Sequence, residues 1–304
     1  MNVQSEKLVG VEVSNLFMRA VLLNGAGEVT DMHEAPVDRR ESITSQLINF
    51  INQTKAKFGS FERVGIALSG LVDRRTNRVV LSKQMPEYVT VDLAREIAQA
   101  TGVEAVLEND ANAAAFGEYT LGAGRGSQNL FYILLGNGIG GAFIIEGNLW
   151  RGASGFAGEF GHILIDSEEN LRLEDVASAP NFLRRIKHRI QQDHTSSLAR
   201  ISEDELTIDD VVREARNGDG FTQMMLERTG NYVGTAVASV VNLLNIEKIV
   251  VGGEIVQAGE PILQGIRNNA REYSFQPSFE TTEIVAGSLG SRAVSVGAAL
   301  LSRK

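Results

Sequence analysis

The sequence predicts an α/β protein made of two domains of like construction that enclose a cleft. Its 304 residues suit two domains of ~150 residues each. A β-hairpin followed by α/β units opens the chain, and the same order returns at Leu130. Hydrophobic residues at 43% and charged residues at 22% are typical of a globular chain with a sizeable core. We expect one lobe from residues 1–118 plus 290–304 and a second from residues 119–289.

The first half of the chain predicts a hairpin and two α/β units. Two apolar runs with a short polar interruption, Leu8–Val13 and Phe17–Leu23, are typical of paired strands. Helical spacing of apolar residues starts at Ile43 and precedes a short buried strand at Val64–Leu68. The second unit has a helix at 91–100, a strand at 105–107, and an alanine-rich helix that opens at Asn109-Asp110 and ends about Tyr119.

The second half repeats this plan with more helices. We expect a strand at 131–135, a glycine turn from Gly136 to Gly141, and a strand at 143–145. The small residues of a long helix at 221–244 allow a neighbouring backbone to approach closely, as at Gly230 and Gly234. The remaining expected elements are helices near 174 and at 182–191, 208–215 and 294–301, and strands at 249–251 and 284–285.

Charge and composition exclude several classes of function. The 29 basic and 38 acidic residues give a net charge of −9, which disfavours direct binding to nucleic acid. The chain has no cysteine, so disulfides, thiolate catalysis and cysteine zinc sites are excluded. It shows no signal peptide and no apolar run long enough to span a membrane, so we expect a cytoplasmic protein without a membrane partner.

A glycine-rich turn is the first candidate for chemistry. Gly136, Gly138 and Gly141 fit the pattern G-x-G-x-x-G after a strand, with an acidic residue, Glu159, further on. A dinucleotide site needs a helix after the last glycine, whereas AFIIEGNLW is typical of β structure. Two interpretations stay open: a hairpin turn without a ligand, and a turn whose backbone amides bind one anion.

Several segments together resemble a known family. They are NDANAAAFGEYTLGAGRGSQNLFYILLGNGIGGAFIIEGNLWRGASGFAGEFGH (109–162), LEDVASA (173–179), VGTAVASVVNLLNIEKIVVGG (233–253) and LGSRAVSVGAALL (289–301). The sequence is similar to the ROK family of sugar kinases and sugar-responsive repressors. The resemblance implies a duplicated actin-like, ribonuclease H-like fold with a small-molecule sugar in the interdomain cleft and ATP phosphates between the two hairpins. It also implies a homodimer.

The resemblance assigns roles to individual residues. It makes Asp110 the general base, and Asn109, Asp110, Glu159, His162 and Glu174 the sugar-binding residues. Carboxylates suit vicinal hydroxyls because each offers two acceptor oxygens. Simpler interpretations stand beside these: Asp110 as a helix N-cap, Glu159 as a solvated loop charge, and Glu174 as a charge that complements a helix N-terminus.

The phosphate loops depart from the family pattern. Where the family has D-x-G-G-T-K, this chain reads EVSNLF from Glu12 to Phe17, which removes two glycines, a hydroxyl and a cation. In the second loop Asn137 replaces threonine. The residues assigned to phosphate or nucleotide binding are Glu12, Gly136, Asn137, Gly138, Gly140, Gly252 and Gly253.

The family's zinc site is also missing. Family members commonly bind zinc through a histidine and three cysteines after the G-H pair, and this chain has no cysteine. We expect no structural zinc, and His162 is then not a metal ligand. The sugar-binding segment must be held by packing or by a partner subunit.

Three functions follow from these matches and departures. The first is a sugar-binding protein, for a hexose or N-acetylhexosamine, whose ATP-dependent phosphorylation is weakened or lost. The second is an active kinase that uses Mg-ATP, with Asp110 as base and Glu12 near magnesium. The third is a sugar-responsive regulator without its own DNA-binding domain, because the first strand starts near Leu8.

Overall fold

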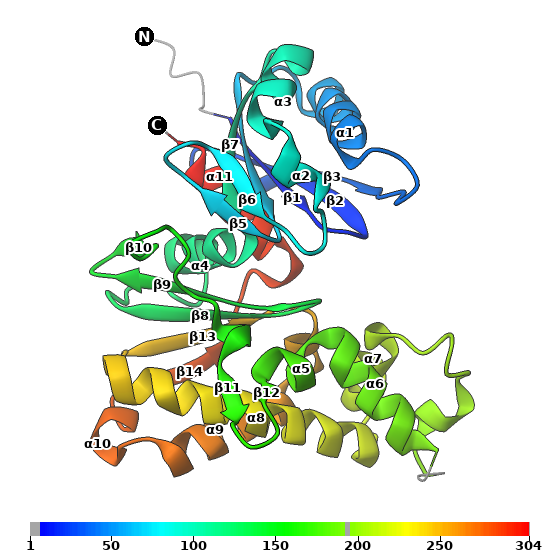
Figure 1. Cartoon of the computed structure of the whole chain (residues 1–304), viewed down its shortest axis with the longest axis vertical. Helices are drawn as coiled ribbons and strands as arrows, with labels where there is room; N and C mark the ends of the chain where they lie inside the picture. Colours follow the sequence, from blue (N-terminus) through cyan, green and yellow to red (C-terminus); the bar gives the residue numbers. More distant parts are fainter. Residues whose placement is uncertain (1–6, 192–194, 304) are drawn as a thin grey trace. The chain divides into compact units, whose positions relative to one another are not determined.

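The computed structural model describes residues 7–191 and 195–303 (Figure 1). Contacts group them into two units. Unit 1 contains the described residues up to Arg125, together with Leu149–Ala157 and the residues from Arg292 onward. Unit 2 contains Gly126–Asn148 and Gly158–Ser291. The lobe boundaries expected from the sequence, 1–118 plus 290–304 and 119–289, stay a prediction.

Unit 1 is built on a five-stranded sheet with the order β3-β2-β1-β4-β7, drawn in blue to cyan in Figure 1. The first three strands are antiparallel, and β4 and β7 extend the sheet in parallel from β1. The sheet strands are β1 (Leu8–Val13), β2 (Phe17–Leu23), β3 (Val29–Pro36), β4 (Arg63–Leu68) and β7 (Glu104–Asn109). The other elements are β5 (Leu71–Asp73), β6 (Arg78–Leu81), α1 (Ile43–Phe58), α2 (Glu87–Thr90), α3 (Leu93–Thr101), α4 (Asp110–Leu121), η4 (Gly290–Arg292) and α11 (Ala293–Leu301).

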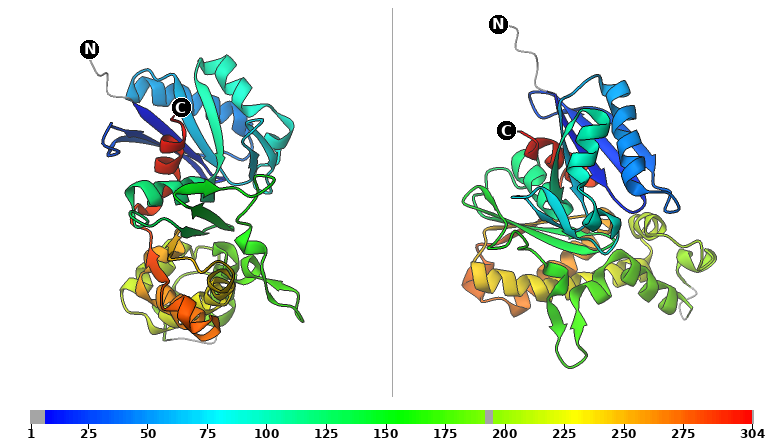
Figure 2. Two further views of the ribbon diagram at one scale, coloured as in Figure 1. Left: turned by 90° about the vertical axis from the view of Figure 1, so that its left-hand side faces the viewer. Right: turned by 45° about the horizontal axis from the view of Figure 1, so that its top comes forward.

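The two faces of this sheet pack differently. Val9, Val11 and Val13 share one face with the apolar residues of α1 and α3 in a single core. On the other face α11, drawn in red in Figure 2, packs against β1 and β4. Gly10 and Gly65 are opposite each other there, and a Cβ on either would overlap a carbonyl oxygen of α11. These two glycines therefore let a helix backbone rest directly on the strands.

Unit 2 repeats the strand order, with β10-β9-β8-β13-β14. Strands β8 and β9 are antiparallel, while β8, β13 and β14 are parallel. The sheet strands are β8 (Leu130–Leu135), β9 (Ile139–Ile145), β13 (Lys248–Gly252) and β14 (Glu283–Ala286), together with β10 (Asn148–Trp150), of which Leu149 and Trp150 are grouped with unit 1. The remaining elements are β11 (Leu164–Asp166), β12 (Leu171–Arg172), α5 (Leu173–Ala177), α6 (Ala179–Ile190), α7 (Ile208–Arg216), α8 (Gly220–Leu244), α9 (Glu260–Tyr273), α10 (Gln276–Phe279), η1 (Phe160–His162), η2 (Ser197–Arg200) and η3 (Ile255–Ala258).

Close packing of α8 against α9 confirms the expectation drawn from the small residues of α8. A Cβ on Gly230 would overlap the carbonyl oxygen of Ile262, and one on Gly234 would lie 2.5 Å from that of Ile266. The partner helix α9 is not among the elements expected from the sequence. Within residues 7–191 and 195–303, no helix is both long enough and apolar enough to cross a membrane.

Both expected hairpins are present, since β1 pairs antiparallel with β2 and β8 with β9. Each continues into a third strand, β3 or β10. The turn expected from Gly136 to Gly141 is shorter, since β9 starts at Ile139. Gly140 and Gly141 are therefore strand residues, opposite Leu134 and Ile133 of β8.

Candidate functional site

Asn109 and Asp110 lie where β7 ends and α4 begins. Oδ1 of Asn109 accepts a hydrogen bond from Asn112 N at 3.0 Å, so Asn109 is the N-cap of α4. Asp110 is the first helical residue, and its Oδ1 accepts from Ala111 N at 2.8 Å. The interpretation of Asp110 as the cap is therefore wrong. The Asn109 amide donates to Asp110 Oδ1 at 3.1 Å and to Gly70 O at 3.0 Å, which fixes the neighbouring carboxylate.

A buried carboxylate directly precedes this pair. The Glu108 side chain is 2% exposed, and its Oε2 accepts from Arg151 Nη2 at 2.6 Å and Nε at 3.2 Å. Its Oε1 accepts from Asn109 N and Asn112 Nδ2, both at 3.1 Å. Because an unpaired buried carboxylate is costly, these bonds hold the start of α4 and the segment Leu149–Ala157 together within unit 1.

Glu12, at the end of β1, is within electrostatic range of Asp110. Burial raises the pKa of Glu12 to about 7; the charge of Arg19 lowers this pKa and that of Asp110 raises it. Arg19 Nη1 lies 3.3 Å from Glu12 Oε2, and Arg19 Nε lies 2.8 Å from Glu34 Oε2. Arg19 also lies over the Phe17 ring at 4.5 Å. Glu12, the acid of the first phosphate loop, is therefore ion-paired with Arg19.

The turn between β1 and β2 is closed by its own serine. Ser14 Oγ accepts from Leu16 N at 3.2 Å and from Phe17 N at 3.0 Å, and Ser14 N donates to Phe17 O at 2.9 Å. A phosphate cradle needs such backbone N–H groups to point at the anion. In this turn the N–H groups of Leu16 and Phe17 are bound to Ser14 Oγ.

The glycine turn of unit 2 is bound to a carboxylate. Glu174 Oε2 accepts from Ile139 N at 3.0 Å, and a Cβ on Gly138 would lie 3.1 Å from the same oxygen. Gly136 N donates to Gly138 O at 3.0 Å, and Gly136 O accepts from Ala179 N at 2.8 Å. The turn at Gly136–Gly138, which contains Asn137, and the predicted sugar ligand Glu174 therefore form one cluster.

Glu159 and His162 are carried by a short segment that packs on β9. Gly141 N donates to Gly158 O at 2.8 Å, and Gly158 has a φ of 99°. Phe160 is 3% exposed and makes an edge contact with Phe131 at 5.1 Å between ring centroids. This packing fixes the segment, while Glu159 and His162 stay half exposed at 51% and 38%.

The hairpin of β11 and β12 brings Glu174 and His162 to one place in unit 2. Leu173 N donates to Ile163 O at 3.0 Å, and a Cβ on Gly161 would lie 3.2 Å from Glu174 Oε2. Arg172 Nη1 is 3.0 Å from His162 Nδ1. The structure thus groups Glu159, His162 and Glu174 within unit 2, and Glu12, Asn109 and Asp110 within unit 1.

Close packing leaves no room for a side chain at Gly252 and Gly253. A Cβ on Gly252 would overlap the Tyr132 hydroxyl, and one on Gly253, whose φ is 106°, would overlap Leu135 O. Their assignment to nucleotide binding stays a prediction. Within the described ranges, no group of three or more His, Asp or Glu side chains is placed to hold a metal ion.

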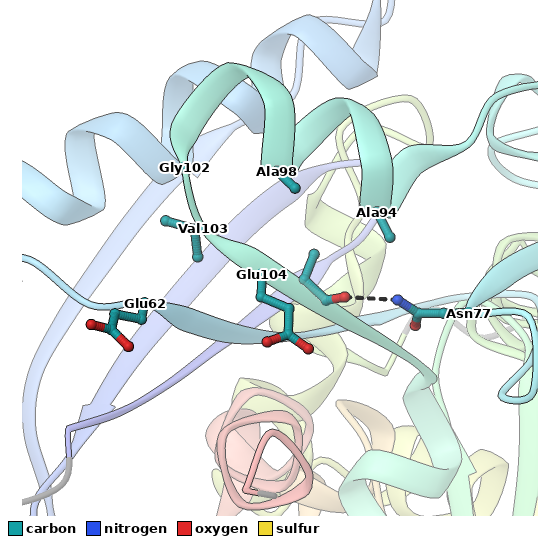
Figure 3. Close-up of a pocket in the computed structure, with 8 residues that line it drawn as sticks. Glu62, Asn77, Ala94, Ala98, Gly102, Val103 and Glu104 are labelled. Carbon is teal, nitrogen blue, oxygen red and sulfur yellow. Dashed lines mark hydrogen bonds between the residues drawn. The ribbon is translucent and has the colours of Figure 1, made fainter.

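A cavity of about 680 Å³ lies elsewhere in unit 1, beside β7 (Figure 3). It contains none of the predicted site residues. Asn77, on its wall, donates to Ala105 O and accepts from Leu107 N, both at 2.8 Å. Because β7 ends the sheet, Asn77 satisfies backbone groups that the edge would otherwise expose. We therefore interpret this wall as structural.

Four residues of the site were not singled out from the sequence: Arg19, Glu108, Arg151 and Arg172. Arg19 could have been found, because the hairpin places it opposite Glu12 and opposite charges pair across strands. Glu108 also gives a signal, since it is a charge at the end of an apolar strand. The contacts of Arg151 and Arg172 depend on tertiary packing and have no local signal.

The model of the ROK family matches residues 8–304. The chain belongs to the ROK family. A glucokinase of Thermotoga maritima is 30% identical over 98% of this chain and 98% of its own length. A xylose repressor of Caldicellulosiruptor bescii is 27% identical over 95% of this chain and 76% of its own length. A ROK family glucokinase from Streptomyces griseus, solved in complex with glucose and AMPPNP, is 28% identical with a TM-score of 0.87, over 98% of this chain and 99% of that one.

Membership in the ROK family confirms the predicted fold class. The two units with the same strand order are the halves of the actin-like two-domain fold shared by the family's solved glucokinases. Kinases and repressors are both among the relatives. The choice between these activities therefore rests on the site residues.

Proposed function

We propose that this ROK protein binds a hexose or N-acetylhexosamine and transfers phosphate from ATP weakly or not at all. The sugar-binding residues that we propose, from the family resemblance, are Asn109 and Asp110 of unit 1 and Glu159, His162 and Glu174 of unit 2. The proposal is supported by the ROK match over residues 8–304 and by the presence of all five residues that the family uses.

The chemistry of these residues suits a polyol. Asp110 and Glu159 offer acceptor oxygens for sugar hydroxyls, while the imidazole of His162 can donate. Glu174 already accepts one backbone N–H through Oε2, which holds its carboxylate in place for a hydroxyl. Asp110 is fixed in the same way by Asn109 Nδ2 and Ala111 N, so the ligands on each unit are preorganised.

The observation that carries weak transfer is the closed turn between β1 and β2. Its N–H groups at Leu16 and Phe17 bind Ser14 Oγ, and Glu12 is bound to Arg19. Loss of one preorganised donor in a site that stabilises transition-state charge costs about 10²–10³ in rate. Two such donors are engaged here, so we expect a transferase activity far below that of an intact kinase.

A working sugar kinase is the second candidate. It is favoured by the similarity to a glucokinase that covers 98% of both chains. In that case Asp110 accepts the proton of the attacking hydroxyl, and its two fixed hydrogen bonds orient the carboxylate for this step. Mg-ATP would supply the transferred phosphoryl group.

Calorimetric titration with glucose, mannose and N-acetylglucosamine, each with and without Mg-ATP, together with a coupled assay for ADP release, tests the proposal. We expect sugar binding that Asp110→Asn weakens, with little or no sugar-dependent ADP release. The exposed Asp204→Asn in unit 2 is the matched control and should bind as the wild type does.

Sugar-dependent turnover that Asp110→Asn abolishes while sugar affinity is largely retained would establish the kinase and overturn the preferred function. Absence of binding to any sugar of the panel would overturn both candidates.

A further inference from the structure

The strongest unassigned contact joins Arg172 to His162. Arg172 Nη1 lies 3.0 Å from His162 Nδ1. The contact is within unit 2, between the last residue of β12 and the last residue of η1. Ten residues separate the two side chains in sequence, and the hairpin of β11 and β12 closes that gap.

The backbone of Arg172 is held on three sides. Its N–H donates to Asp175 Oδ2 at 3.0 Å, and the residue pairs with Leu164 across the hairpin. The next N–H, that of Leu173, donates to Ile163 O at 3.0 Å. Because Ile163 directly follows His162, this pairing fixes the start of the Arg172 side chain beside the imidazole ring.

The hairpin that carries Arg172 is also closed locally. Asp166 Oδ1 accepts from Glu168 N at 2.9 Å and from Glu169 N at 3.1 Å, which forms the turn between the two strands. Local hydrogen bonds therefore hold the hairpin on which Arg172 lies beside His162 Nδ1.

The contact determines which ring nitrogen carries the proton. A guanidinium group has five N–H donors, no acceptor, and is always charged in proteins. His162 Nδ1 must then present its lone pair to Arg172, and the proton of the neutral imidazole lies on Nε2. We propose that Arg172 is a positioning residue that fixes His162 as an Nε2–H donor toward the sugar.

The donor so formed lies near a carboxylate. His162 Nε2 is 3.7 Å from Glu159 Oε2, too long for a direct hydrogen bond. A sugar hydroxyl that lies beside this pair can accept from Nε2–H and donate to the carboxylate, so both of its hydrogen-bonding functions are used. The site then discriminates against a deoxy or fluoro analogue at that position. This specificity rests on the proposed sugar binding, whereas the proton position does not.

Nitrogen NMR of the ¹⁵N-labelled protein without sugar tests the proton position. The chain has four histidines, and His162→Gln assigns the signals. In the wild type we expect an unprotonated Nδ1 and a protonated Nε2 at His162. Arg172→Met should weaken this preference toward the mixture of a free neutral imidazole, in which Nε2–H is the major form, and Arg172→Lys, which keeps a charged donor, should restore it in part. Unchanged His162 nitrogen shifts in Arg172→Met would overturn the proposal.

Sugar affinity provides the second measurement, using the hexose that binds the wild type. We expect roughly tenfold weaker binding in Arg172→Met, because about one hydrogen bond loses its orientation. Arg184→Met removes an exposed arginine of α6 in the same unit and should leave the affinity unchanged.

Deoxy analogues of the hexose show which hydroxyl group accounts for the loss of affinity in Arg172→Met. Among monodeoxy analogues, the penalty for the hydroxyl bound at His162 should shrink in Arg172→Met, while the penalties for the other hydroxyls stay the same. Equal penalties in both proteins would overturn the positioning role. If no hexose binds the wild type, the proposed function fails, and the nitrogen shifts alone decide whether Arg172 sets the proton position.

Discussion

The two units contain sheets with the same strand order and hold their candidate residues by different means. In unit 1 charged side chains do this, through the pairs of Glu12 with Arg19 and Glu108 with Arg151. In unit 2 it is done by close approach of glycine backbones, as at Gly141 and Gly158. The same architecture therefore tolerates two ways of fixing a site.

This difference has a chemical consequence. Beside the turn at Gly136–Gly138, Ile139 N donates to Glu174 Oε2, and the absence of a Cβ on Gly138 leaves room for this carboxylate. The turn of unit 1 lacks glycine, and its N–H groups bind Ser14 instead. We therefore expect the turn of unit 1 to offer an anion fewer free N–H donors than the glycine-rich loop of the family pattern does.

Removal of the buried charge in unit 1 should have the largest effect. Glu108→Ala leaves Arg151 without its carboxylate partner, so we expect a loss of about 3–5 kcal/mol in the free energy of unfolding. Denaturant unfolding measures it. Glu104→Ala is the matched control on the same strand, because the Glu104 side chain is 59% exposed and its pair with Arg63 contributes at most about 1 kcal/mol.

A double variant tests whether the loss of stability in Glu108→Ala comes from the unpaired charge of Arg151. Glu108→Met with Arg151→Met replaces the pair by apolar side chains and should recover part of the stability lost in Glu108→Ala. Recovery is incomplete because Arg74 Nε, 3.6 Å from Glu108 Oε2, and Asn112 Nδ2 also lose their acceptor. Equal losses in Glu108→Ala and Glu104→Ala would contradict the view that ion pairing holds the site of unit 1.

Addition of one methyl group to the glycine contact in unit 2 should have the next largest effect. In Gly158→Ala the new Cβ overlaps Gly141 O, and the φ of 99° is strained for alanine. We expect about 2–4 kcal/mol of destabilisation from overpacking and strain together. Gly126→Ala is the control, because Gly126 has a φ of 85° but open space around it.

The difference between these two variants isolates the cost of packing from that of backbone strain. The same thermal or denaturant unfolding experiment measures both. If Gly126→Ala costs as much as Gly158→Ala, close backbone approach is not what holds the segment of Glu159 and His162.

Much of this architecture could be predicted from the sequence, because it depends on local pattern. Strands β1 and β2 occur at the predicted bounds, since both are runs of apolar residues interrupted by a single charge, Glu12 in β1 and Arg19 in β2. Strand β3 was missed because its residues, VTDMHEAP, alternate between half-buried and exposed positions and contain no apolar run. Helix α9 was missed because Gly265 and two asparagines interrupt its pattern, although Gly265 is needed for the approach to α8.

The residues of the candidate site likewise divide into those that the sequence predicts and those that it does not. The family motifs name Asn109, Asp110, Glu159, His162 and Glu174, and their roles stay predictions. The motifs do not contain the side chains that orient these residues, because Arg151 and Arg172 come from other segments of the chain. Only the pair of Glu12 and Arg19 follows from a predicted register.

The titration of Glu12 gives the smallest expected effect and the most direct view of the charged site in unit 1. Its pKa is raised from 4.5 to about 7 in the folded state, chiefly by burial. Between these values the folded protein keeps a proton that the unfolded chain releases, so the stability contributed by this group falls as pH rises from about 4.5 to 7. Glu12→Gln should remove that fall, and the gain in stability over wild type should grow across this window to roughly 1–3 kcal/mol. Glu12→Asp keeps a buried carboxyl and should keep the pH dependence. Urea unfolding at a series of pH values measures all three proteins, and parallel curves for wild type and Glu12→Gln would show that Glu12 is charged in both states and that Arg19 fully compensates its burial.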